Sequence, residues 1–247
     1  MSFKEKNALI TGGSRGIGKG IALEFASLGT NIIFNYHRNH EAALETKLAI
    51  EKMGVKCLKI KADLSKSDKI RNLFQIIRNE FGHLDILVNN AASGIQRPAE
   101  ELEEKHWDWV MNVNAKAAWM CSIEASKLMS RGGNIINITS LGSQKVLENY
   151  FLVGTSKAAL ETSTRYLAVE LAPKGISVNA VSGGYVDTEA LNHFPNRKEM
   201  LVSGKRNPAG RILTAKDIAK TVSFLCTDDA EMIRGQVIVI DGGYSLI

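Results

Sequence analysis

Three residues in the second half of the chain, Ser140, Tyr150 and Lys157, could together move a proton. Serine and tyrosine hydroxyls donate hydrogen bonds, and a positively charged lysine favours negative charge on a nearby oxygen. Lys157 is followed by the periodic run AALETSTRYLAVELA, which predicts a helix over about 150–172. Helical positions seven apart point within about 40° of one another, so Tyr150 is expected on the Lys157 face, about 10.5 Å along the axis.

A glycine-rich turn near the start of the chain could hold the phosphates of a nucleotide. The run TGGSRGIGKGIA follows an apolar strand and opens a predicted helix. Gly12, Gly16 and Gly18 would let backbone N–H groups approach a pyrophosphate, and the helix beginning near Ile17 adds its positive end. The alternative is a tight turn without a ligand.

The residues that end the second predicted strand indicate which dinucleotide is bound. An acidic residue there would bind a ribose 2′-hydroxyl and favour NAD. The chain has Tyr36, His37 and Arg38 instead. Arg15 and Arg38 could pair with a 2′-phosphate, with His37 nearby, so the sequence favours NADPH. The alternative is that these cations are only solvated surface groups.

The elements that must position these residues alternate regularly along the chain. Strands are predicted at 7–11, 31–36, 55–62, 84–90, 134–140, 176–182 and 236–241, and helices at 17–29, 41–53, about 67–81, about 104–130, about 150–172 and about 215–226. Apolar strands without alternation are buried on both faces, so we expect an α/β, doubly wound parallel sheet of seven strands with helices on both faces. Residues 1–247 are expected to form one domain, in which 183–214 is a substrate-binding loop.

Composition excludes several other classes of protein. The 247 residues are 45% hydrophobic and 23% charged with a net charge of +5, unlike a disordered chain, a collagen or a disulfide scaffold. The widely spaced Cys57, Cys121 and Cys226 are expected to be reduced core thiols, and the scattered histidines predict no metal site. With no signal-peptide core or membrane-length apolar run, we expect a soluble cytoplasmic protein.

Taken together, the motifs resemble those of the short-chain dehydrogenase/reductase family. The resemblance runs from residue 7 to 245 and is carried by TGGSRGIG, Asp63 in KADLS, NNAA at 89–92, Asn114 in MNVNAKA, Ser140 in NITS, Lys157 in SKAAL and IRGQVIVIDGG. It implies a Rossmann-type fold and NADP as cofactor. It also implies that Asp63 and Leu64 hold the adenine, Asn90 and Ala91 support the ribose, and Gly183, Gly184, Val186 and Thr188 flank the nicotinamide. The full expected cofactor set is Gly12, Ser14, Arg15, Gly16, Ile17, Gly18, His37, Arg38, Asp63, Leu64, Asn90, Ala91, Asn114, Lys157, Gly183, Gly184, Val186 and Thr188.

One departure from the family pattern bears on the substrate. Most reductases of the family have Tyr four residues before the lysine, but here that residue is Val153, and the nearest tyrosine is Tyr150. When an enoyl thioester is reduced, hydride goes to the β-carbon while charge develops on an oxygen three bonds away, so the acid must stand farther from the hydride donor. The Tyr-x6-Lys spacing and the surrounding runs resemble the NADPH-dependent type III bacterial enoyl-[acyl-carrier-protein] reductases.

By this resemblance, Tyr150 hydrogen-bonds or protonates the enolate, Lys157 binds the nicotinamide ribose and Ser140 contacts cofactor or substrate. Val146 stands where another tyrosine is expected. The alternatives are a 3-oxoacyl or other carbonyl reductase, in which Tyr150 reaches a ketone, and a non-catalytic NADP-binding regulator.

The charge distribution suggests a partner for this activity. Between 191 and 211, five basic residues face one acidic residue; they are Arg197, Lys198, Lys205, Arg206, Arg211 and Glu199. This patch would steer an acidic acyl-carrier protein or the phosphates of coenzyme A, and it is too narrow for nucleic acid. The loop at about 185–211 would close over the acyl chain, with Leu191 and Phe194 in contact with it. No membrane partner is expected, and family analogy suggests a homotetramer, with Trp107, Trp109 and Trp119 packed at a subunit interface.

Overall fold

The computed structural model describes residues 3–188 and 197–247, the helical segment 197–200 by its backbone alone. Seven parallel strands form one sheet in the order β3-β2-β1-β4-β5-β6-β7. The strands are β1 (Asn7–Ile10), β2 (Asn31–Tyr36), β3 (Cys57–Lys61), β4 (Ile86–Asn89), β5 (Gly133–Ser140), β6 (Ile176–Gly183) and β7 (Val237–Ile240). This confirms the predicted seven-stranded, doubly wound α/β fold.

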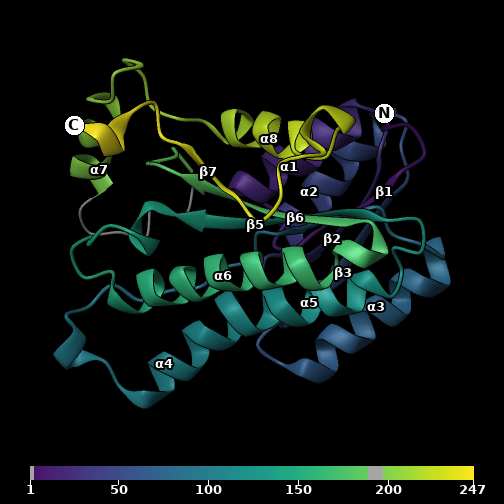
Figure 1. The fold of residues 1–247 in the computed structure, drawn as a ribbon, viewed down its shortest axis with the longest axis horizontal. Coiled ribbons are helices and arrows are strands. Elements are labelled where there is room, and N and C mark those ends of the chain that lie inside the picture. Colours follow the sequence, from purple (N-terminus) through teal and green to yellow (C-terminus); the bar gives the residue numbers. More distant parts are fainter. Residues whose placement is uncertain (1–2, 189–196) are drawn as a thin grey trace.

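Helices cover both faces of the sheet (Figure 1). One face carries α1 (Gly16–Ser27), α2 (His40–Glu51) and α8 (Ala215–Phe224), and the other carries α3 (Ser67–Phe81), α4 (Glu104–Met111), α5 (Ala117–Ser126) and α6 (Phe151–Glu170). Each strand sends alternate side chains to the two faces: in β1, Ile10 joins the first core and Leu9 the second. The central strands β1 and β4 are buried at every position, so they are largely apolar, whereas the edge strands β3 and β7 are only partly buried.

The register between β5 and β6 fixes the part of the sheet that matters most below. These two strands pair over eight positions, from Gly133 opposite Ile176 to Ser140 opposite Gly183. Ser140 and Gly183 therefore lie side by side at the carboxyl end of the sheet, where ligands bind in open α/β folds.

Two predicted elements differ from the structure. The helix expected over 104–130 is α4 and α5 joined by a π-helical turn, Asn112–Lys116, and it ends at Ser126. The stretch 183–214, expected to be loop, contains helix α7 (Arg197–Lys205). The sequence of α7, RKEMLVSGK, is mostly polar and charged, so it lacks the apolar periodicity from which a helix is predicted.

The three cysteines are free and buried, as expected. Burial raises the pKa of each thiol to about 12, so the thiolate needed for reaction is not populated at neutral pH.

Among the described helices, none combines the length and apolar character needed to cross a membrane.

Candidate active site

A cavity of about 1060 Å³ opens at the carboxyl ends of the strands, between the glycine-rich turn and the segment that enters α6. It brings together residues from both halves of the chain. Of the residues predicted for the site, those that line the cavity are Gly12, Ser14, Arg15, Gly16, Ile17, His37, Arg38, Asp63, Leu64, Asn90, Ala91, Ser140, Tyr150, Lys157, Gly183, Gly184, Val186 and Thr188.

The glycine-rich turn has the backbone geometry of a phosphate cradle. Gly12 and Gly16 adopt φ values of 64° and 57°, a region that disfavours other residues. A Cβ on Gly12 would lie 3.1 Å from Cα of Ala91, so a side chain there would press on the loop after β4. Helix α1 begins at Gly16, has no acidic residue in its first turn and directs its unpaired N–H groups and positive end toward the cavity.

Asn90 braces this turn from the end of β4. Its side-chain amide donates to the main-chain oxygens of Thr11 at 2.9 Å and Gly12 at 3.2 Å. The main-chain N–H groups of Asn90 and Ala91 both donate to Oγ1 of Thr11 at 2.9 Å. The loop after β4 and the turn after β1 are thus held together as one wall of the cavity.

Two predicted cofactor residues, Gly18 and Asn114, do not line the cavity. A Cβ on Gly18 would collide with the main-chain oxygen of Gly12, so Gly18 permits the turn to pack on α1. Asn114 lies buried in the π-helical turn, accepts from the main-chain N of Ser93 at 2.8 Å and donates to Oγ of Ser156 at 2.9 Å. Its position is therefore that of a link between the loop after β4 and α6.

The far end of the cavity is cationic. Arg15, His37 and Arg38 are exposed at its rim, and Nε2 of His37 lies 3.9 Å from a carboxylate oxygen of Asp63. Partial burial works to raise the pKa of Asp63, but hydrogen bonds from Ser65 and the nearby His37 outweigh it and hold the pKa below its usual value. A 2′-phosphate would find two guanidinium groups and an imidazole here.

Tyr150 stands at the opposite end of the cavity, and its predicted helical placement is wrong. It is the N-cap of α6, with φ −107° and ψ 13°, so it precedes the helix and does not occupy a helical turn. The preceding residue, Asn149, has φ 56°, which turns the chain sharply just before Tyr150. Its ring lies on Gly142, where a Cβ would approach the ring carbons to 2.5 Å.

The Tyr150 hydroxyl donates to Oγ of Ser140 at 3.5 Å. Burial raises the pKa of Tyr150, with the Ser140 hydrogen bond acting in the other direction, so the phenol is neutral at physiological pH. It can therefore donate a proton or a hydrogen bond to a ligand in the cavity.

Lys157 is buried on α6 and its Nζ donates to the main-chain oxygen of Ile138 at 2.7 Å. Burial lowers the pKa of Lys157 to about 8, while the negative charge of Glu161 opposes this fall. The ammonium form thus predominates at pH 7, and Lys157 lines the same cavity as Tyr150 and Ser140.

Sequence reasoning missed Tyr185, which lines the cavity from the loop after β6. Its ring meets that of Tyr244 edge-on, with 5.2 Å between centroids. Burial, the contact with Tyr244 and the nearby Tyr150 raise the pKa of Tyr185 to about 12. Its place in the run VSGGYVDT, between predicted cofactor residues, is the signal that could have identified it.

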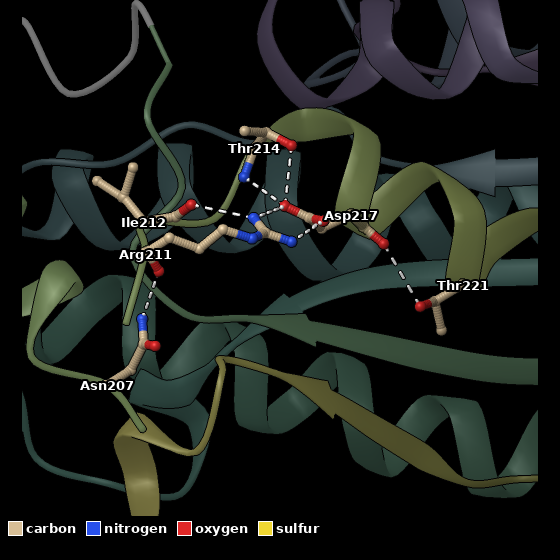
Figure 2. Close-up of polar contacts among 6 residues, drawn as sticks. All are labelled: Asn207, Arg211, Ile212, Thr214, Asp217 and Thr221. Carbon is tan, nitrogen blue, oxygen red and sulfur yellow. Dashed lines mark hydrogen bonds and ion pairs between the residues drawn. The ribbon is translucent and has the colours of Figure 1, made fainter. Parts of the chain in front are cut away.

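The segment between β6 and α8 is anchored at both ends. Val186 forms a β-bridge with Leu213, and the main-chain N–H of Asp187 donates to Leu213 O at 3.1 Å. Figure 2 shows the second anchor: both terminal nitrogens of Arg211 lie 2.7 Å from the carboxylate of Asp217 in the first turn of α8.

The Arg211 contact corrects the predicted basic patch, because Asp217 already pairs with that cation. Lys205 and Arg206 remain exposed. Leu191 and Phe194, and the side chains of Arg197, Lys198 and Glu199, lie outside the described residues.

In the part of the chain that the structure describes, no three His, Cys, Asp or Glu side chains cluster as a metal site would require.

Residues 12–245 match the family model described as "Enoyl-(Acyl carrier protein) reductase". The chain belongs to the short-chain dehydrogenase/reductase family. It is 37% identical to 1-cyclohexenylcarbonyl-CoA reductase of Streptomyces collinus over 97% of this chain and 87% of that protein. It is 38% identical to hydroxynaphthalene reductase-like protein Arp2 of Metarhizium anisopliae (strain ARSEF 549), over 98% and 96%.

The fold matches that of solved members of the family. A short chain dehydrogenase from Burkholderia cenocepacia J2315, solved in complex with NADP, superimposes with a TM-score of 0.92 at 32% identity, over 99% of this chain and all of that one. The phosphate cradle and the cationic rim described above fit a dinucleotide with a 2′-phosphate.

Against this family background, Val153 gains significance. The position that holds Tyr in most short-chain reductases is here buried and absent from the cavity lining. A Cβ on Gly94 would lie 2.5 Å from a methyl of Val153, so this side chain packs tightly under the loop after β4. The hydroxyl on this side of the cavity comes from Tyr150.

Proposed function

We propose that this protein is an NADPH-dependent reductase of trans-2-enoyl thioesters, with enoyl-[acyl-carrier-protein] of fatty-acid elongation as the substrate. One observation carries the proposal: Tyr150 presents its hydroxyl to the cavity, whereas residue 153 is a valine buried outside it. The relatives include a reductase acting on a coenzyme A thioester, which agrees with this substrate class.

NADP(H) is the cofactor, and it supplies the hydride when bound. The turn at Gly12 and Gly16 would hold the pyrophosphate, and Arg15 and Arg38 the 2′-phosphate. Asp63 and Leu64 would flank the adenine, as the family resemblance implies. Lys157 would hold the nicotinamide ribose hydroxyls.

Tyr150 would act on the thioester oxygen. In an enoyl thioester the reduced β-carbon is three bonds from the carbonyl oxygen on which negative charge develops. A neutral phenol beside that oxygen stabilises the charge where it forms. Ser140 lies 3.5 Å from the same hydroxyl and orients it, and the Lys157 ammonium favours a more negative oxygen nearby.

A carrier with acidic groups would dock beside the substrate segment. Lys205 and Arg206, at the end of α7, are exposed there and can attract an acyl-carrier protein or coenzyme A phosphates. The Arg211 charge contributes less, since Asp217 neutralises it.

A carbonyl reductase is the second candidate. The hydrogen bond between Tyr150 and Ser140, with Lys157 nearby, would also suit protonation of a ketone oxygen, and Arp2 is a hydroxynaphthalene reductase-like relative. In a ketone, the oxygen that receives the proton is bonded directly to the carbon that receives the hydride, so the proton donor must stand close to the hydride donor. In the family pattern, a tyrosine at position 153 would provide that geometry.

Substrate comparison tests the proposal directly. NADPH oxidation is followed with crotonyl thioester and, separately, with acetoacetyl thioester, each on coenzyme A and on acyl-carrier protein. We expect turnover of the crotonyl compounds. Turnover of the acetoacetyl compounds alone would support the carbonyl reductase, and turnover of none, with NADPH still bound, would support a non-catalytic regulator.

The variant Tyr150→Phe tests the proton donor. We expect kcat to fall by about 10²-fold or more, because a positioned acid contributes about 10²–10⁴-fold, while NADPH binding measured by fluorescence is retained. Tyr166→Phe is the matched control, since Tyr166 is an exposed tyrosine on the same helix. Full activity of Tyr150→Phe would show that the donor is assigned wrongly.

A further inference from the structure

A buried carboxylate with no place in the reaction lies one helical turn beyond Lys157. Glu161 is 4% exposed, on the face of α6 that packs against β5. Burying a carboxylate is costly unless it is paired or hydrogen-bonded, so its partners indicate what it does.

The partners of Glu161 come from one short segment of chain. Oγ1 of Thr139 donates to its carboxylate at 2.9 Å and Nε2 of Gln144 at 3.1 Å, and Oγ of Ser143 also contacts it. Ser143 Oγ lies 2.7 Å from the main-chain oxygen of Ser140 as well. Thr139, Ser143 and Gln144 thus bind the residues around Ser140 to α6 through a single side chain.

This segment, residues 139–144, forms the floor beneath Tyr150. Gly142 lies directly against the Tyr150 ring, and a Cβ on Gly154 of α6 would be 2.6 Å from the Gly142 oxygen. The segment and helix α6 are therefore closely packed at Gly142 and Gly154. A loss of the Glu161 bonds would therefore move Ser140 and the surface on which the Tyr150 ring rests.

Glu161 also acts on Lys157 by charge. Of the described charged groups, it is the one whose field opposes the effect of burial on Lys157. The side chains that face this region from β5 and the turn after it, Thr139, Ser143 and Gln144, are uncharged. Tyr150 and Tyr185 also line the cavity, and both are neutral at physiological pH because burial raises both pKa values.

Two lysines near α6 have other surroundings. Lys145, just after the segment, donates to the main-chain oxygen of Ser245, and its charge acts on Asp241. Lys116, on the π-helical turn that contacts α6, is exposed.

We propose that Glu161 is a positioning residue with two roles: it fixes the segment 139–144 under Tyr150, and it stabilises the positive charge of Lys157. This rests on the proposed roles of Tyr150 and Lys157 in the cavity, and not on which thioester is reduced.

The test uses three variants of the full chain. Glu161→Gln removes the charge and one acceptor, Glu161→Asp keeps the charge but shortens the reach, and Ser143→Ala removes one donor. Glu170→Gln is the matched control, because Glu170 is an exposed glutamate on the same helix. For each, the NADPH dissociation constant is measured by fluorescence between pH 6 and 9.5, together with kcat on whichever thioester is turned over.

For Glu161→Gln we expect the alkaline loss of NADPH affinity to move to lower pH by about one unit, since Lys157 then deprotonates more easily. For Glu161→Asp and Ser143→Ala we expect an unmoved alkaline limb and a kcat lowered by about tenfold, because the floor under Tyr150 shifts. Glu170→Gln should match the unmodified chain in both measurements.

Two results would overturn the inference. An unmoved alkaline limb in Glu161→Gln would remove the electrostatic role, and a kcat of Ser143→Ala within twofold of the unmodified chain would remove the positioning role. The second result decides even if Glu161→Gln does not fold. Because the NADPH titration needs no thioester, a failure of both thioesters to react would count against the proposed function alone.

Discussion

Asn149 is a single residue on which the direction of Tyr150 depends. Its φ of 56° turns the chain immediately before α6, and its main-chain oxygen accepts from the N–H of Arg97 at 3.2 Å. Asparagine tolerates this left-handed conformation better than other residues apart from glycine. The side chain itself is exposed, so the backbone conformation is what the position requires.

The effect of a substitution at position 149 should therefore depend on how well the new residue tolerates a positive φ. Asn149→Val is expected to lose about 1–2 kcal/mol of unfolding free energy and most of its kcat, because a β-branched residue strains this conformation. Asn149→Gly should retain activity within a few-fold. Urea unfolding and steady-state kinetics check both, and equal activities of the valine and glycine variants would contradict the backbone argument.

At the scale of residues, the sequence was informative about which side chains meet and uninformative about how. Ser140, Tyr150 and Lys157 do line one cavity. Tyr150 caps α6 and does not lie within it, and helical periodicity carries no information about the turn at Asn149 or the contact of the ring with Gly142. Tyr185 was missed because a single tyrosine does not stand out by residue type, although it lies between predicted cofactor residues.

At the scale of elements, the N-terminus of α8 is stabilised by one acidic residue, Asp217. Asp217 accepts from the main-chain N and the hydroxyl of Thr214, both at 2.8 Å, and binds Arg211 through both carboxylate oxygens. The Arg211 pair comes first among the causes that hold the Asp217 pKa well below its usual range, against the opposing effect of burial. Asp217 thus caps α8 and binds the end of the segment between β6 and α8 (Figure 2).

Asp217→Asn is expected to lower the unfolding free energy by about 1–2 kcal/mol at pH 7. A carboxylate whose pKa is lowered in the folded state adds stability that is complete above its unfolded pKa, about 3.9, and is lost as pH falls below it. The difference from the unmodified chain should therefore be constant near neutrality and shrink below about pH 4. Urea titrations at several pH values measure it.

Asp68→Asn is the matched control for Asp217→Asn. Asp68 is also an acid in the first turn of a helix, but it is exposed and contacts only one cation that the structure describes, Lys69 at 3.4 Å. A loss in Asp68→Asn as large as in Asp217→Asn would show that helix-end charge, and not the Arg211 pair, carries the effect.

Element prediction succeeded where packing enforces a pattern. The central strands are buried on both faces and the long helices pack one face on the sheet, so the pattern of apolar residues in each follows its packing. Helix α7 and the π-helical turn lack such an apolar pattern. Helix α7 is mostly polar and charged, and the π-helical turn holds Asn114, whose side chain is hydrogen-bonded to Ser93 and Ser156.

For the molecule as a whole, the strand order and layers follow from the sequence because right-handed crossovers leave few topologies. The net charge of +5 is less concentrated than the sequence suggested, since Arg211 is neutralised. Trp107, Trp109 and Trp119 are exposed in the single chain, and Trp109 also lines the cavity. The subunit interface and the tetramer stay predictions.

Lys205 and Arg206 nevertheless predict a salt effect on the largest substrate. KM for an enoyl group on acyl-carrier protein should rise by about tenfold between low salt and 0.5 M NaCl, because steering of an acidic partner is screened. KM for a neutral pantetheine thioester should change little. The double variant Lys205→Glu/Arg206→Glu should abolish this difference, and Lys52→Glu/Lys220→Glu, at exposed positions on other elements, should preserve it.

The β-bridge between Val186 and Leu213 has a consequence for how this chain could be altered. It brings the two ends of the intervening segment together outside the sheet, so the length between them hardly affects the frame. Doubling the length of a closed loop costs only about 0.6 kcal/mol of entropy. The residues between Thr188 and Leu213 could therefore be lengthened, or exchanged for those of relatives with other substrates, at little cost in entropy. Such an exchange has to keep Thr188, which lines the cavity, and the hydrogen bond from the Ala209 N–H to the Gly242 oxygen.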